Sequence, residues 1–276
     1  MKSCYTFCMS KNISNTISPK MLARIQALRL MDDDFMTVVF DGDIELTEFL
    51  LRILLSRTDL RVKSVMTQKE KRNLFGRSVR LDILAEDMSG KIYNIEVQRA
   101  DKGASPKRVR YNLALLDSHT LKKNEDFEQL PETYIIFITE NDYFGLGKPV
   151  YEIEKTVKNT NLPFDDGCTI IYVNGSYRGE DAIGKLMHDF CSANADEMNY
   201  NELASKVRLH KKQTKGVENM CRIFEEYGDE REVETRNKIV EDLLRQNKLS
   251  IEDISAVTKV PLEQVKKLAE KLVVTA

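Results

Sequence analysis

The chain has 276 residues, of which 42% are hydrophobic and 31% charged, and its formal net charge is -2. This composition is that of a soluble globular protein with a full hydrophobic core. It excludes a general electrostatic attraction to nucleic acid, so any DNA contact must come from local basic residues.

The five cysteines and three histidines are scattered along the chain. They form no closely spaced cluster, so the sequence indicates neither a zinc site nor a disulfide scaffold. Residues 1–20 lack the apolar stretch of a secretory signal, and no apolar run approaches the length of a membrane span. We therefore expect a cytoplasmic protein without a membrane partner.

The first part of the chain combines a polar segment with helical patterns. Residues 1–19 are polar, and we expect them to be flexible. A short helix is expected at 20–31, and apolar residues at three-four spacing predict an amphipathic helix at 43–56. Residues 60–67 have the composition of a strand, and 68–77 that of a charged connection.

The stretch Val79–Arg99 predicts two strands joined by a tight turn. The turn is polar and ends in Gly90, and a three-residue hairpin loop places glycine at this position. Counting back from such a loop pairs Asp82 with Glu96, and the two-residue period of side chains puts Gln98 on the same face.

A loop of two residues would shift this pairing and place Asp82 opposite Ile95. With the three-residue loop, two carboxylates share one face of the hairpin and can hold a divalent metal ion. An ordinary antiparallel hairpin with a solvated polar face has the same pattern, so both interpretations remain open at this level.

The elements after the hairpin complete a mixed sheet with helices against it. Ser105 and Pro106 fit the N-cap and first turn of a helix that runs to about residue 123. Strands are expected at 133–139, 148–155 and 168–173, and a helix at 181–191. The fold class is therefore α/β (α+β).

The C-terminal part of the chain is mostly helical and highly charged. Within it, residues 238–272 predict three short helices separated by tight turns, as in a helix-turn-helix-like unit. Basic and acidic residues nearly balance there, whereas a helix that reads DNA usually has a clear basic face. A structural or oligomerisation role fits this unit at least as well as DNA reading.

The order of helix, strand with Asp82, turn, strand with Glu96 and Gln98, and helix resembles the PD-(D/E)XK nuclease superfamily. More closely, it is similar to the PD-(D/E)XK nuclease family transposases of the recombination-promoting nuclease group. The resemblance covers about residues 30–190. The stretches that carry it are Arg80–Asp87 and Tyr93–Gln98, with Asp34-Phe35 and Phe49-Leu50 upstream and Arg108 and Tyr111 downstream.

This resemblance implies a restriction-endonuclease-like mixed β-sheet core flanked by helices, with a C-terminal all-helical extension. On this basis we expect the nuclease-like domain at 20–195 and the helical region at 196–276. The resemblance further implies a DNA partner, and the C-terminal helices suit the formation of a homo-oligomer.

The resemblance also implies a site. Asp82, Glu96 and the backbone carbonyl of Val97 would ligate Mg²⁺ or Mn²⁺, ions that prefer oxygen ligands. A helix acid often completes such sites, and Glu45 is preferred over Glu48 for this role because it lies nearer the helix start.

Gln98 would be the third catalytic residue, where the superfamily usually has lysine. Glutamine supplies no positive charge, but its amide can orient a water molecule or contact a phosphate. Arg108 and Arg110 are the candidates for neutralising phosphates.

The leading hypothesis is therefore a metal-dependent DNA endonuclease linked to mobile elements or DNA recombination. The first alternative is a protein that kept the fold but lost catalysis, and acts by binding DNA or another protein. The second alternative is a helical adaptor that self-associates through its C-terminal unit.

Overall fold

The structure, a computed structural model, describes residues 17–71, 78–99, 101–246 and 248–274. Residues 1–16, which were expected to be flexible, lie outside this range. Two compact units are present, one spanning 18–213 and the other containing 214–276. The boundary expected near residue 195 lies inside the first unit.

The first unit is built on a six-stranded sheet with the order β1-β2-β3-β4-β6-β5. Its strands are β1 (Val62–Lys71), β2 (Val79–Asp87), β3 (Ile92–Gln98), β4 (Thr133–Thr139), β5 (Val150–Ile153) and β6 (Cys168–Asn174). Strands β1, β2 and β3 pair antiparallel, whereas β3, β4 and β6 run parallel. Strand β5 pairs antiparallel with β6 at one edge. The expected mixed sheet is confirmed.

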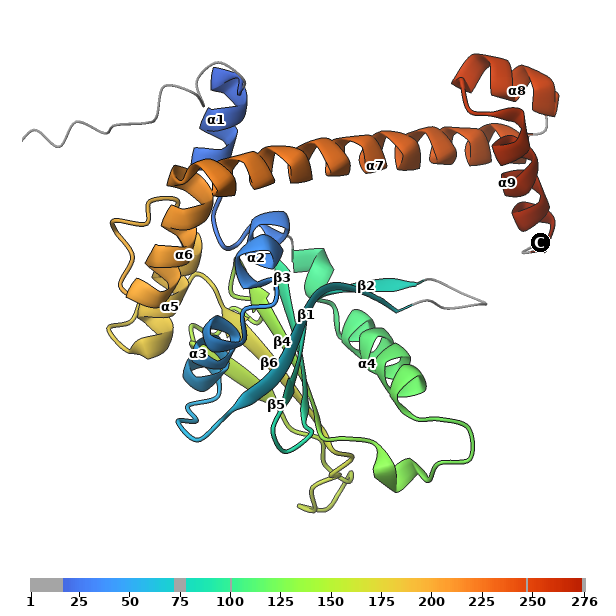
Figure 1. The fold of residues 1–276 in the computed structure, drawn as a ribbon. Helices are drawn as coiled ribbons and strands as arrows, with labels where there is room; N and C mark the ends of the chain where they lie inside the picture. Colours follow the sequence, from blue (N-terminus) through green and yellow to red (C-terminus); the bar gives the residue numbers. More distant parts are fainter. Residues whose placement is uncertain (1–16, 72–77, 100, 247, 275–276) are drawn as a thin grey trace, which may run out of the picture. The chain divides into compact units, whose positions relative to one another are not determined.

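Helices cover both faces of this sheet, with α4 on one side and α3 and α5 on the other (Figure 1). The helices of the first unit are α1 (Pro19–Gln26), α2 (Asp33–Phe40), α3 (Ile44–Leu54), α4 (Pro106–Thr120), α5 (Ala182–Cys191) and α6 (Asn201–Lys212), with short 3-10 turns η1 (Asp101–Ala104) and η2 (Phe127–Gln129). Because the central parallel strands are covered on both faces, their sequences are nearly continuous apolar runs.

Local sequence signals begin two of the helices next to the hairpin. The Asp43 carboxylate accepts a hydrogen bond from the Leu46 N–H at 3.0 Å and caps α3. The Ser105 hydroxyl accepts from the Arg108 N–H at 3.3 Å, and Pro106 occupies the first turn of α4. The start of α4 is therefore set locally, and this start positions Arg108.

In the first unit, α2 and β1 differ from the sequence-based expectation. Helix α2 was not predicted, because Thr37, Val38 and Val39 are β-branched and weak helix formers. Burial compensates for this weak propensity. Phe40, for example, packs against Phe190 of α5, with ring centroids 6.4 Å apart. Strand β1 continues to Lys71 through the expected connection, since an edge strand tolerates charged side chains.

The second unit contains α7 (Thr214–Gln246), α8 (Ile251–Thr258) and α9 (Leu262–Val274). The end of α7 packs with α8 and α9 around Val240, Ile254, Val260 and Val265. The first member of the expected group of three short helices is thus the end of a helix of 33 residues. None of the helices that the structure describes is long and apolar enough to cross a bilayer.

Candidate active site

The hairpin turn has the three-residue form, for which the sequence predicts that Asp82 pairs with Glu96. Gly90 has φ +85, and its N–H donates to the Asp87 carbonyl at 3.0 Å. The Asp87 N–H donates to the Lys91 carbonyl at 3.0 Å and closes the loop. Regular pairs then follow from Glu86 with Ile92 back to Ile83 with Ile95. The same register, extended by one step, places Asp82 beside Glu96.

At Asp82 the regular backbone pairing of β2 with β3 ends, and the carboxyl groups of Asp82 and Glu96 accept the hydrogen bonds instead. The Val97 N–H donates to Asp82 Oδ2 at 3.0 Å, and the Asp82 N–H approaches Glu96 Oε1 at 3.4 Å. Both carboxyl groups are buried, since Asp82 is 7% exposed and Glu96 is 0% exposed. The two acids therefore lie together inside the sheet rather than on a solvated face.

Strand β2 pairs with β1 on its other side, and this pairing is also irregular at Asp82. Regular pairs join Thr67 with Ile83 and Lys69 with Leu81, but Gln68 and Asp82 between them are not paired. Gln68 has φ +50, an unfavourable conformation for a residue with a side chain. Backbone strain of this kind gathers at functional sites, where the surrounding structure supports it.

Alternation of faces also fails near this irregularity. Leu81 and Leu84 both pack in a buried cluster with Leu116 of α4, although strict alternation would assign them to opposite faces. The apolar residues of this part of β2 thus hold α4 against the hairpin.

Arg108 of α4 connects the two motif residues of β3. Its Nη2 donates to Glu96 Oε2 at 2.8 Å, and its Nη1 donates to Gln98 Oε1 at 2.8 Å and to the Gly103 carbonyl at 3.0 Å. The guanidinium also lies 5.9 Å from the centre of the Phe137 ring. This arrangement places one positive charge against the buried acid pair.

A cavity of about 290 Å³ opens at this point of the sheet. It is lined by Met31, Asp33, Gln68, Arg80, Asp82, Val97, Gln98, Arg99 and Arg108. Three arginines and two acids face one small space, while Glu96 lies buried behind it. Such a set of charges suits a phosphate together with a cation.

The pKa values of the two buried acids are shifted by their surroundings. Burial raises the pKa of Asp82 well above its usual value, and the nearby Glu96 carboxylate adds to this increase. Burial also raises the pKa of Glu96, against the opposing effect of the Arg108 charge. Paired acids with raised pKa values in a cavity are typical of functional sites, and a cation would favour their ionised forms.

Comparison with known proteins identifies the domain that carries these residues. Residues 42–176 match the family model of the PD-(D/E)XK nuclease family transposases. This segment is similar to that family and spans just under half of the chain. The resemblance stated from the sequence is thereby confirmed, and the mixed sheet flanked by helices is consistent with the PD-(D/E)XK fold. Searches of curated proteins and of solved structures gave no match.

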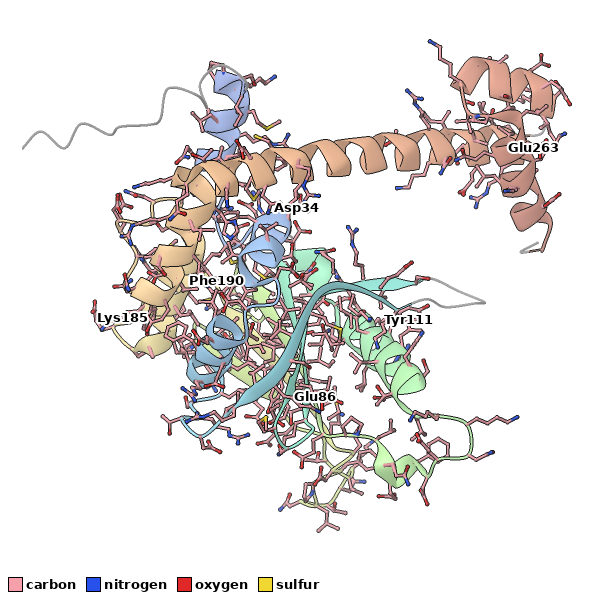
Figure 2. The ribbon with its side chains drawn as sticks, viewed as in Figure 1. Asp34, Glu86, Tyr111, Lys185, Phe190 and Glu263 are labelled. Carbon is pink, nitrogen blue, oxygen red and sulfur yellow. The ribbon has the colours of Figure 1, made fainter. Side chains whose placement is uncertain are left out.

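The nuclease-family match covers all the candidate site residues named from the sequence, from Glu45 to Arg110. It supports a nuclease- or transposase-like function in general. Asp34 of α2 lies before the matched segment, whereas Tyr111 of α4 lies within it. Figure 2 labels both residues.

The donor set of the nuclease domain fits a hard divalent ion. Asp82 and Glu96 supply carboxylate oxygens, and neither histidine nor cysteine lines the cavity.

Protein side chains alone do not complete a metal site. Across the described residues, no group of three or more His, Cys, Asp or Glu side chains is gathered closely enough to hold an ion. Magnesium usually keeps several waters and takes one or two carboxylates, with substrate oxygens as further ligands. Asp82 and Glu96 match this requirement, and water or DNA would supply the remaining oxygens.

Asp33 is the acid that sequence reasoning missed. It lies in the first turn of α2, lines the cavity and contributes to the raised pKa of Asp82. Asp32 beside it accepts a hydrogen bond from Arg99 at 2.8 Å, which ties the start of α2 to the end of the hairpin. The sequence pair Asp34-Phe35 pointed to this helix but not to Asp33.

The helix acids expected from the sequence lie elsewhere. Glu45 is exposed at the start of α3 and does not line the cavity. Glu48 accepts a hydrogen bond from the Val62 N–H at 2.9 Å and forms an ion pair with Arg52, so it joins α3 to β1. Of these helix acids, only Asp33 lines the cavity.

The two arginines proposed for phosphate contact lie on different faces of α4. Arg108 faces the cavity, whereas Arg110 is exposed two residues later and does not line it. Residues two apart on a helix do not share a face. Arg80 and Arg99 line the cavity instead and were not predicted as phosphate contacts.

Proposed function

We propose that the protein is a metal-dependent DNA endonuclease that hydrolyses phosphodiester bonds and is linked to mobile elements or DNA recombination. The observation that carries this proposal is the buried pair of Asp82 and Glu96 beside a cavity lined by three arginines. The nuclease-family match of residues 42–176 supports the same reaction class.

In this proposal Asp82 and Glu96 hold Mg²⁺ or Mn²⁺, with the Val97 carbonyl and Asp33 as further candidate ligands. When bound, such an ion supplies positive charge that stabilises phosphodiester hydrolysis and makes water a better nucleophile. The residues of the chain bind and orient the DNA. Gln98 contacts a phosphate or the attacking water, and Arg108 and Arg80 neutralise phosphate charge.

Plasmid cleavage by the purified full chain tests this function. Wild type is expected to nick supercoiled DNA with Mg²⁺ or Mn²⁺ and to stop when a chelator is added. Asp82→Asn and Glu96→Gln should lower the rate at least about 100-fold, since each removes one of the two ion-binding carboxylates. Glu45→Gln, prepared in the same way, is the matched control for a contaminating nuclease. Cleavage by Asp82→Asn at the wild-type rate would overturn the proposal.

A second candidate is a catalytically weak or inactive nuclease-fold protein that binds DNA or another protein. The ion pair between Arg108 and Glu96 favours it, because the arginine already compensates one of the two acid charges. Titration calorimetry separates the candidates. This alternative expects no divalent-metal binding but salt-sensitive DNA binding, whereas the enzyme requires metal binding that Asp82→Asn abolishes.

We further propose that the helices of 214–276 support a homo-oligomer. Ile239, Leu249 and Val257 are exposed apolar side chains in this unit. Sedimentation of wild type and of a variant with Ile239→Asp and Val257→Asp tests this. A monomeric wild type would contradict the proposal.

A further inference from the structure

The orientation of the Gln98 amide is decided by the group that faces it. Arg108 Nη1 lies 2.8 Å from one end of this amide. A guanidinium has only donors, so the amide atom that it faces must be the oxygen. The amide NH₂ is therefore the polar end that Arg108 leaves available, and Gln98 lines the cavity together with Asp82.

Gly103 provides the space that this orientation needs. A Cβ at residue 103 would lie 2.0 Å from Gln98 Oε1 and 3.0 Å from its amide carbon. No atom pair can approach to 2.0 Å without a bond, so any larger residue at this position would force the amide to move. The Gly103 carbonyl also accepts from Arg108 Nη1 at 3.0 Å. Gly103 thus contacts both members of the pair.

Arg108 is itself held in one place by several partners. Besides Gln98 and Gly103, it donates to the fully buried Glu96 carboxylate at 2.8 Å. A side chain bound at both ends of its fork has little freedom to rotate, and a charged donor polarises the amide that it contacts. The Gln98 amide is consequently both oriented and strengthened as a donor.

We propose that Gly103 is a positioning residue which, together with the guanidinium of Arg108, presents the Gln98 NH₂ to a non-bridging phosphate oxygen of DNA bound in the cavity. Gln98 is the residue that touches the substrate, and Gly103 acts only through it. This inference rests on the proposed nuclease function and specifies how a neutral side chain serves that site.

The test is a double-mutant cycle between Gly103 and Gln98 in the full chain. Gly103→Ala should lower kcat for plasmid cleavage about 100-fold, as expected for loss of one oriented donor, and Gln98→Ala should do the same. In the double variant the loss should be no larger than in Gln98→Ala, because the added Cβ then has no amide to displace. Gln98→Ala is thus the matched background for the glycine substitution.

Two further readouts separate positioning from folding. The atom that Gly103→Ala displaces is the end of a flexible side chain. The melting temperature of this variant and its Mg²⁺-induced thermal shift should therefore remain close to those of wild type. Gln98→Glu keeps an oxygen for Arg108 but has no NH₂. It should weaken binding of a short DNA duplex about tenfold in chelator, measured by fluorescence anisotropy, with a matching loss of cleavage.

The outcomes distinguish this inference from the proposed function. If wild type cleaves DNA but Gly103→Ala costs as much in the Gln98→Ala background as in wild type, the positioning role is wrong while the nuclease function stands. Wild-type activity and binding in Gln98→Glu would also overturn the inference alone. A wild type that neither binds nor cleaves DNA overturns both.

Discussion

Arg108 and Glu96 form an ion pair of 2.8 Å in which the acid is fully buried and the arginine side chain is 36% exposed. Without a metal, Arg108 is the cation that keeps a charged Glu96 tolerable inside the sheet. A divalent ion would compete for the same carboxylate. Protein stability, ion binding and the position of Arg108 are therefore linked, and four predictions follow from the groups involved.

Arg108→Met should destabilise the metal-free protein by about 2 kcal/mol at pH 7. Removing one partner of a buried pair costs about 3–5 kcal/mol, and solvent around Arg108 reduces this value. The loss should be smaller at pH 5, since an unpaired buried Glu96 takes up a proton. Urea unfolding at both pH values measures it, with exposed Lys107→Met as the control. Equal stability of wild type and Arg108→Met at pH 7 would contradict the prediction.

Asp82→Asn should separate stability from ion binding. In chelator the variant should be at least as stable as wild type, because it relieves the repulsion between two buried acids while Asn Oδ1 can still accept from the Val97 N–H. Saturating Mg²⁺ or Mn²⁺ should raise the melting temperature of wild type but not of the variant. An unchanged metal-induced shift in Asp82→Asn would exclude this carboxylate as a ligand.

The buried acids should make metal-free stability depend on pH. Their folded-state pKa values are raised above the ordinary 3.8 of Asp82 and 4.5 of Glu96, so the folded state binds more protons than the unfolded state. Their contribution to stability is fully present below these ordinary values and is lost as pH rises through the higher folded-state values.

Other carboxyl groups act in the opposite direction, because the pKa values of Asp87 and Asp181 are lowered in the folded state. The prediction therefore concerns the difference between wild type and Asp82→Asn in chelator. Wild type should lose stability relative to the variant as pH rises from about 4 to 7. A difference that stays constant over this range would contradict the raised pKa values.

Asp33 and Glu45 form a matched pair of helix acids, one in the cavity and one outside it. Asp33→Asn should reduce the Mn²⁺-induced thermal shift and lower the cleavage rate by at least about tenfold, whereas Glu45→Gln should change neither. Parallel thermal-shift and plasmid assays provide the comparison. The reverse result would restore Glu45 as the third acid.

The arrangement of the hairpin could be predicted from local residues because its geometry depends on a turn of three residues. Gly90 takes a positive φ at low cost, and the pairing of the flanking strands follows from it. The cap at Ser105 likewise places Arg108 in the first turn of α4. Short-range hydrogen bonds and backbone preferences are encoded by neighbouring residues, so a single sequence is enough to read them.

The position of Asp33 and the burial of Asp82 and Glu96 could not be predicted from local sequence. Asp33 reaches the cavity because α2 packs against β1 and β2, far away in the sequence. The sequence also left a solvated face open for Asp82 and Glu96, whereas both acids are buried in a sheet that helices cover on both faces. Burial of this kind depends on which distant elements pack together.

By itself, the sequence predicted the family resemblance and the mixed sheet, and it placed Asp82 beside Glu96 if the turn has three residues, because these follow from ordered motifs and local turn chemistry. Only the tertiary structure decided that Asp33 rather than Glu45 lines the cavity, and that Arg108 holds the Gln98 amide beside Gly103. Those relationships join residues through packing across the sheet, and no local pattern specifies the distances involved.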